Sequence, residues 1–70
     1  VDFVVTQRRE PILLVEAKRG DQDVDRGLKY LRARFPKAQA WQLSETGTKD
    51  YVTPDGIRVA PALAFLRDLA

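Results

Sequence analysis

The sequence predicts a small domain of the α/β or α+β class, built from a β-hairpin, a crossover helix, a parallel strand, a short hairpin and a C-terminal helix. Two apolar stretches at residues 1–6 and 11–18 are separated by four polar residues. Apolar residues then recur with helical spacing over 24–35, and a third apolar stretch follows at 38–43. A chain of 70 residues has room for one such domain, so 1–70 is treated as a single unit.

The first two stretches are expected to form a hairpin. Residues 1–6 (VDFVVT) are rich in β-branched and aromatic side chains, which favour strands. The return strand at 11–18 contains the continuous apolar run Ile12–Val15. Such a run is typical of a strand that is covered on both faces. Residues 7–10 are polar and have the length of a hairpin connection.

A helix and a parallel strand are expected next. The apolar residues spaced by 4, 3 and 4 positions are Val24, Leu28, Leu31 and Phe35. Asp21 or Asp23 is the expected N-cap, and Pro36 is expected to end the helix. A third strand at 38–43 would then pair in parallel with the strand at 11–18, because a strand–helix–strand unit makes a right-handed crossover.

The last third of the chain is expected to hold a short hairpin and a closing helix. Strands at 51–53 and 57–59 flank Pro54-Asp55-Gly56, a turn sequence in which Gly supplies a positive φ. Pro61 suits the first turn of a helix. In that helix the residues expected to face the core are Leu63, Leu66 and Leu69, with Phe65 at the edge of the core.

The composition excludes several classes of site. The chain contains no Cys and no His, which removes disulfides, thiolate and imidazole metal sites, and catalytic triads that need either residue. The net charge of +2 permits a nucleic-acid partner without arguing for one. No apolar run is long enough to span a membrane, so no membrane partner and a cytoplasmic location are expected. The sequence begins directly in an apolar strand, as expected of a piece of a longer protein.

The most informative constellation lies in the first hairpin. A symmetry point near Arg9 would place Asp2 opposite Glu16, and Lys18 on the same face, because side chains alternate along a strand. Directly opposed Cβ atoms lie about 4.5–5.5 Å apart, so the two carboxylates need a positive neighbour. Either Lys18 bridges them as an ordinary salt bridge, or a divalent cation such as Mg²⁺ does. Gln39 and Gln42 lie on the next strand and could face the same site.

The order of the segments resembles a known family. Asp2, thirteen intervening residues and Glu16-Ala17-Lys18 are similar to the signature of PD-(D/E)XK nucleases, which share a restriction-endonuclease-like core. More narrowly, VDFVV, PILLVEAKRGD, GLKYLRARFP, AWQL and IRVAPALAFLRDL together resemble an uncharacterised C-terminal domain carried by many prokaryotic AAA+ type ATPases. The resemblance covers nearly the whole chain.

The resemblance implies functions for three residues. Asp2 and Glu16 would be ligands of Mg²⁺, Lys18 would be the catalytic lysine of the motif, and Ala17 would contribute its carbonyl. The chain would be a partial PD-(D/E)XK-like domain, the C-terminal fragment of a longer ATPase in which it cleaves or binds DNA. The alternative is a non-catalytic module that docks on a protein, such as its own ATPase domain.

The resemblance also implies that ATP is bound in a preceding part. This chain contains no G-x-x-x-x-G-K-[ST] motif, so it is not expected to hydrolyse ATP, and alone it is not expected to be an active nuclease.

A further feature of the sequence is a helix rich in basic residues. Candidates for contact with nucleic-acid phosphates are Arg26, Lys29 and Arg34, within the stretch expected to be helical. The simpler interpretation is that these cations form the solvated face of an amphipathic helix. Trp41 in the third strand is expected to belong to the core rather than to a base-stacking surface.

Overall fold

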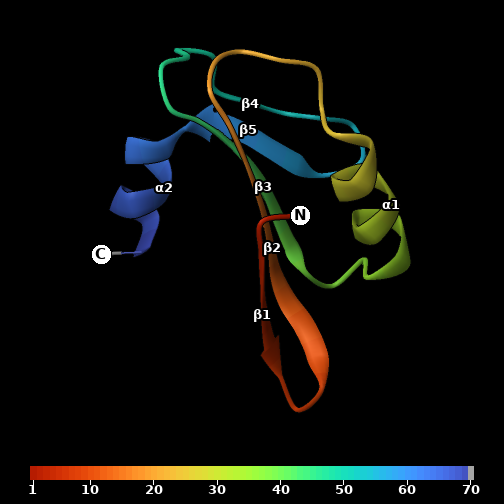
Figure 1. The fold of residues 1–70 in the computed structure, drawn as a ribbon. Helices are drawn as coiled ribbons and strands as arrows, with labels where there is room; N and C mark the ends of the chain where they lie inside the picture. Colours follow the sequence, from red (N-terminus) through yellow and green to blue (C-terminus); the bar gives the residue numbers. More distant parts are fainter. Residues whose placement is uncertain (70) are drawn as a thin grey trace.

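The computed structural model describes residues 1–69 and shows a mixed five-stranded sheet with one helix on each face (Figure 1). The strand order is β1-β2-β3-β5-β4, in which the three central strands are parallel and both edge strands are antiparallel to their neighbours. The α+β class predicted from the sequence is confirmed. The elements are β1 (Phe3–Gln7), β2 (Glu10–Lys18), α1 (Arg26–Arg34), β3 (Gln39–Ser44), β4 (Tyr51–Val52), β5 (Ile57–Pro61) and α2 (Ala62–Leu69).

The predicted hairpin register is confirmed at the end of the hairpin that matters for the site. Phe3 pairs with Val15, which corresponds to a symmetry point at Arg9. A bulge between Val5 and Thr6 then shifts the register, so the connection is a two-residue turn rather than the four polar residues expected. Pro11 sits beside this bulge, where a residue without an N–H disturbs the sheet least.

The crossover helix is also confirmed, but its start differs from the prediction. Neither Asp21 nor Asp23 is the N-cap of α1. Asp25 takes that place, because its carboxylate accepts a hydrogen bond from the backbone N–H of Leu28 at 3.1 Å. After α1 the chain returns as β3, which pairs in parallel with β2 as expected.

The sheet divides the core into two apolar clusters. On one face α1 packs over residues of β2, β3 and β5; the buried members are Leu14, Leu28, Ala38, Ala40, Ile57 and Val59. The apolar residues predicted for the helix, Val24, Leu31 and Phe35, pack against this cluster at its rim. On the other face α2 covers Val15, Trp41, Leu43 and Ala60 with Phe65. The prediction that Trp41 belongs to the core is therefore confirmed.

The face that α2 presents to the sheet is the reverse of the predicted one. Leu63, Leu66 and Leu69 are 64%, 57% and 64% exposed, whereas Phe65 is 7% exposed. The rings of Phe65 and Trp41 meet edge to face, with their centroids 5.0 Å apart. Pro61 is the last residue of β5, so α2 starts directly from the sheet and its first turn sets which face turns inward. The larger aromatic side chain takes the buried position and the leucines lie outside.

The short hairpin agrees with the prediction. β4 pairs antiparallel with β5, and Gly56 adopts a φ of 88° in the turn between them. Within residues 1–69, neither helix is long and apolar enough to cross a membrane.

Candidate functional site

The candidate site lies where β2 and β3 end, on the face of the sheet that α1 covers. In the parallel register Glu16 is level with Gln42, and Lys18 is level with Ser44. Side chains two positions apart share a face. Leu14, two positions before Glu16, packs with Leu28 of α1, so these polar side chains share the face of α1. The sheet therefore places four polar side chains just beyond the apolar cluster under α1.

Asp2 lies next to Glu16, as the sequence predicts, but its carboxylate is engaged with the backbone. The N–H of Asp2 donates to the carbonyl of Val15 at 2.9 Å, and the N–H of Ala17 donates to Oδ2 of Asp2 at 2.6 Å. Asp2 is therefore bonded to Val15 and Ala17, the residues on either side of Glu16 in the neighbouring strand. Glu16 itself is partly buried, and its Oε1 lies 3.1 Å from the amino nitrogen of Val1. The register therefore brings the two carboxyl-bearing residues together at one strand end.

Lys18 turns mainly to a residue that the sequence interpretation missed. Its Nζ donates to Oδ1 of Asp25 at 2.9 Å and lies 3.6 Å from Oε2 of Glu16. Lys18 therefore links Glu16 to Asp25 and not to Asp2. The signal for Asp25 was present, since it stands three residues before the apolar Leu28, the spacing of an N-cap. Asp21 and Asp23 also precede the apolar residues of the helix, so the spacing alone does not identify Asp25 as the N-cap.

The Lys18–Asp25 pair keeps both groups charged. The hydrogen bond to Asp25 raises the pKa of Lys18 above 10.5, although partial burial opposes this. The same hydrogen bond, together with the N–H of Leu28, holds the pKa of Asp25 below 3.8. Because Lys18 remains an ammonium group, it can donate hydrogen bonds and offset negative charge, but it cannot accept a proton near neutral pH.

Gln42 fixes the segment that carries Asp25. Its side chain is 2% exposed, and its Oε1 accepts a hydrogen bond from the N–H of Asp25 at 2.8 Å. Its Nε2 donates to the carbonyl oxygens of Gln22 at 3.3 Å and Asp23 at 3.1 Å. Gln42 does face the site, whereas Gln39 lies at the opposite end of β3. The position of Asp25, the main partner of Lys18, is thus held by one buried amide.

The loop that follows β3 is hydrogen-bonded to the loop that follows β2. The carboxylate of Asp21 accepts hydrogen bonds from the N–H groups of Thr48 and Lys49, both at 3.2 Å. A Cβ at Gly47 would collide with Oδ1 of Asp21 and lie 2.6 Å from Oγ of Ser44, so any other residue there would force these side chains to move. The buried hydroxyl of Ser44 has no hydrogen-bond partner among the described residues. Asp21 therefore joins the two loops instead of capping α1.

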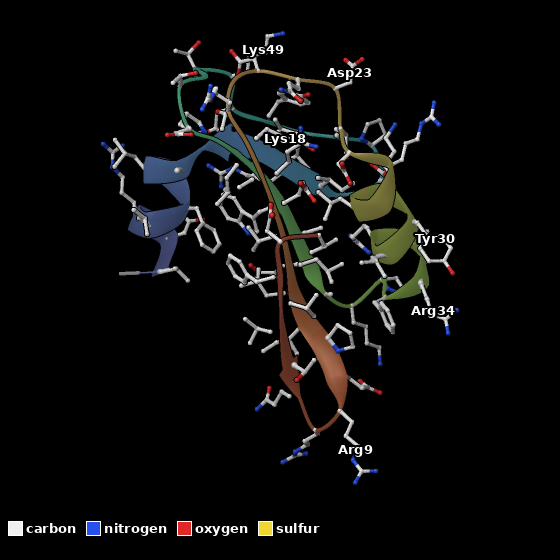
Figure 2. All side chains as sticks on the ribbon, in the orientation of Figure 1. Arg9, Lys18, Asp23, Tyr30, Arg34 and Lys49 are labelled. Atoms are coloured by element: carbon white, nitrogen blue, oxygen red, sulfur yellow. The ribbon has the colours of Figure 1, made fainter. Side chains whose placement is uncertain are left out.

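The predicted nucleic-acid contacts are distributed along α1, from its first residue to its last. Arg26, Lys29 and Arg34 are exposed on α1, and Figure 2 shows Tyr30 and Arg34 pointing away from the sheet while Lys18 lies near the start of α1. Within residues 1–69, none of these three side chains forms an ion pair with Glu16. They remain available for long-range attraction of a polyanion.

The described residues 1–69 contain no group of three or more acidic side chains arranged to hold a metal ion. The donor set nevertheless fits one metal, because Mg²⁺ is commonly held by one or two carboxylates while water and substrate phosphate complete its coordination. Asp2, just before β1, and Glu16 of β2 offer that pair. Comparisons of this chain with protein-family models, with curated proteins and with solved structures found no match.

Proposed function

We propose that this chain is a nuclease-like domain whose Asp2–Glu16–Lys18 site binds Mg²⁺ and serves phosphodiester cleavage or DNA binding within a longer AAA+ type ATPase. The observation that carries the proposal is the hairpin register, which sets Asp2 beside Glu16 and keeps Lys18 on the face of Glu16. The resemblance to PD-(D/E)XK nucleases, whose core has a restriction-endonuclease-like fold, supports the same assignment.

Each residue of the site would have a separate function. Asp2 and Glu16 would hold the metal through carboxylate oxygens, and Ala17 would offer its carbonyl. The bound metal would polarise the phosphodiester and lower the pKa of a water molecule. Lys18, which stays charged because of Asp25, would stabilise negative charge that accumulates on the phosphate during attack. Arg26, Lys29 and Arg34 would attract the nucleic acid without touching the reacting atoms.

The test is cleavage of DNA by the longer ATPase chain in Mg²⁺. We expect the substitution Glu16→Ala to abolish cleavage and to leave the circular dichroism spectrum unchanged. Glu10→Ala is the matched control, because Glu10 lies on the same strand at the opposite end. Equal cleavage by the wild-type chain and the Glu16→Ala chain would refute a catalytic function of this site.

A second function is favoured by a separate observation. Leu63, Leu66 and Leu69 form an exposed apolar stripe along α2, a feature typical of surfaces that bind another protein. Under this alternative the domain docks on a protein, such as its own ATPase domain, and the Lys18 ion pairs serve stability alone. Binding that is lost on Leu66→Lys and kept on Glu16→Ala would favour this alternative.

A further inference from the structure

A pocket lies at the end of the sheet opposite to the Glu16 site. It has a volume of about 250 Å³ and opens between the tip of the β1–β2 hairpin and the end of α1. Its lining residues are Arg9, Glu10, Pro11, Arg34, Phe35, Pro36, Lys37 and Ala38. This volume is below the roughly 300–1,000 Å³ of sites that enclose drug-sized ligands, so the pocket suits one small molecule or one unit of a polymer.

The charge around the pocket is strongly positive and unpaired. The lining contains three cationic residues, Arg9, Arg34 and Lys37, and a single acidic residue, Glu10. Within residues 1–69, none of these four side chains takes part in an ion pair or a hydrogen bond. Arginine at such a position can present a fork of donors to an anionic group. The pocket therefore has an electrostatic preference for an anion that the chain itself does not satisfy.

The backbone at the hairpin tip is strained in a way that places Arg9 at this pocket. Arg8 and Arg9 both have positive φ angles, 54° and 68°. A two-residue turn of this shape strongly prefers Asn-Gly or similar sequences, because residues with a Cβ are disfavoured there. Backbone strain of this kind is concentrated at functional sites. Arg9, the residue of this turn that lines the pocket, therefore keeps a side chain at a position where glycine would relieve the backbone.

The wall opposite the hairpin is apolar and held in place. Phe35 caps α1 and lines the pocket, and the guanidinium of Arg34 lies 5.7 Å from the centre of its ring. The next turn is fixed by a hydrogen bond from Arg32 to the carbonyl of Pro36 at 2.7 Å and by one from the N–H of Ala38 to the carbonyl of Phe35 at 3.0 Å. A planar group can pack on such a surface.

We propose that this pocket binds a nucleoside phosphate, with the phosphate held by Arg9, Arg34 and Lys37 and the base packed against Phe35 and Pro11. The combination of an unpaired cationic rim and an apolar wall fits a ligand that carries a phosphate and a planar body together. The ligand reaches the protein either as a free nucleotide or as one unit of a single strand. This site is separate from the Glu16 site and does not depend on a metal.

The test is an amide NMR titration of the chain with adenosine 5′-monophosphate in the presence of EDTA, which keeps the metal site out of the measurement. We expect shifts confined to Arg9, Phe35 and Lys37 and their neighbours. Inorganic phosphate and adenosine alone should each bind more weakly than the nucleotide. A short oligoadenylate that binds more tightly than the mononucleotide identifies a single strand as the source, and equal affinity identifies the free nucleotide.

Two glycine substitutions in the turn separate binding from folding. Arg9→Gly should relieve the backbone without lowering the melting temperature, and it should weaken nucleotide binding about tenfold or more, as expected on losing a charged hydrogen bond. Arg8→Gly relieves the same turn but removes a side chain outside the lining, so the affinity should stay within about twofold of the wild-type value.

Three results would overturn the proposal. The first is the absence of any shift at the pocket with millimolar nucleotide. The second is equal loss of affinity in the two variants, which would indicate diffuse charge attraction. The third is equal binding of phosphate and nucleotide, which would remove the role of Phe35. Because the titration contains no metal, none of these results bears on the function proposed for Glu16 and Lys18.

Discussion

At the scale of single residues, Gln42 organises the candidate site although it touches no expected ligand. A buried amide has to satisfy both its oxygen and its nitrogen, and Gln42 does so with three backbone groups of the 22–25 segment. It thereby holds Asp25 at the distance at which Lys18 can bond to it. Its effect on the site is indirect, through the position of this segment.

Replacing Gln42 by Leu should therefore destabilise the chain by about 1–3 kcal/mol, because it leaves backbone groups of the 22–25 segment without partners. Urea denaturation followed by Trp41 fluorescence measures this. Gln7→Leu is the control, since Gln7 is exposed at the end of β1 and its side chain forms no hydrogen bond within residues 1–69, and its effect should stay within about 0.5 kcal/mol. Equal effects of the two substitutions would contradict the structural function assigned to Gln42.

Asp25 should make the free energy of unfolding depend on pH in the acidic range. Its hydrogen bond to Lys18 lowers its pKa in the folded chain below 3.8, so the unfolded chain binds the proton more readily. The contribution of Asp25 is complete above about pH 5 and is lost as the pH falls through the lowered pKa. Asp25→Asn keeps a good N-cap but removes the ion pair.

The expected result is a smaller fall in the urea midpoint between pH 7 and pH 3 for the Asn variant than for the wild-type chain. Asp50 and Asp55 also have lowered pKa values, but they titrate in both proteins and cancel in this comparison. Parallel pH profiles would show that the Lys18–Asp25 bond contributes nothing in solution.

The sequence predicts Asp2 and Glu16 as neighbours but not the partner of Lys18, for a physical reason. Hairpin pairing follows from local symmetry, so counting outward from Arg9 gives Phe3 opposite Val15, and the structure agrees. The choice among three aspartates as N-cap depends on Gln42, which is distant in sequence and fixes where the helix starts. Contacts of that kind leave no periodic signal.

At the scale of elements, α2 shows how a periodic pattern can be assigned to the wrong face. Its leucines repeat every three residues, which predicts an inward stripe, yet they lie outside. Phe65 and the small Ala62 and Ala64 form the inner face instead. Small residues allow close approach to the sheet, and the aromatic ring then fills the space beside Trp41. The three-residue spacing of the leucines alone does not tell which face turns to the sheet.

Substitutions on the two faces of α2 should therefore differ greatly. Phe65→Ala should cost about 3–5 kcal/mol, which matches the total stability of about 3–5 kcal/mol expected for so small a core. Leu66→Lys should change stability by no more than about 0.5 kcal/mol. Circular dichroism at 25 °C is then expected to show a largely unfolded Phe65→Ala chain and a folded Leu66→Lys chain. The opposite outcome would restore the face predicted from the leucine spacing.

At the scale of the whole molecule, the sheet separates two functional ends. The ends of β2 and β3 carry Glu16, Lys18 and Gln42, whereas the hairpin tip and the end of α1 carry the cationic pocket at the other end of the molecule (Figures 1 and 2). Glu16 follows Glu10 by six positions along β2, or about 20 Å at 3.3 Å per residue. Each end can therefore be tested without disturbing the other.

The fold could be predicted further than the site because strands, crossover and turn each follow from local patterns. The order of pairing at the sheet edges, the outward leucines and the Lys18–Asp25 bond depend on packing between distant segments. The assignment of Asp2 and Glu16 as metal ligands remains a prediction from the register and the resemblance.

The most direct test of that assignment is an amide NMR spectrum recorded with trace Mn²⁺, with the variants Glu16→Gln and Glu10→Gln alongside the wild-type chain. We predict selective broadening at Asp2 and at Glu16-Ala17-Lys18, abolished by Glu16→Gln and unchanged by Glu10→Gln. Broadening that is absent at this strand end, or that survives Glu16→Gln, would contradict the metal site and leave Asp2, Glu16 and Lys18 as a structural cluster.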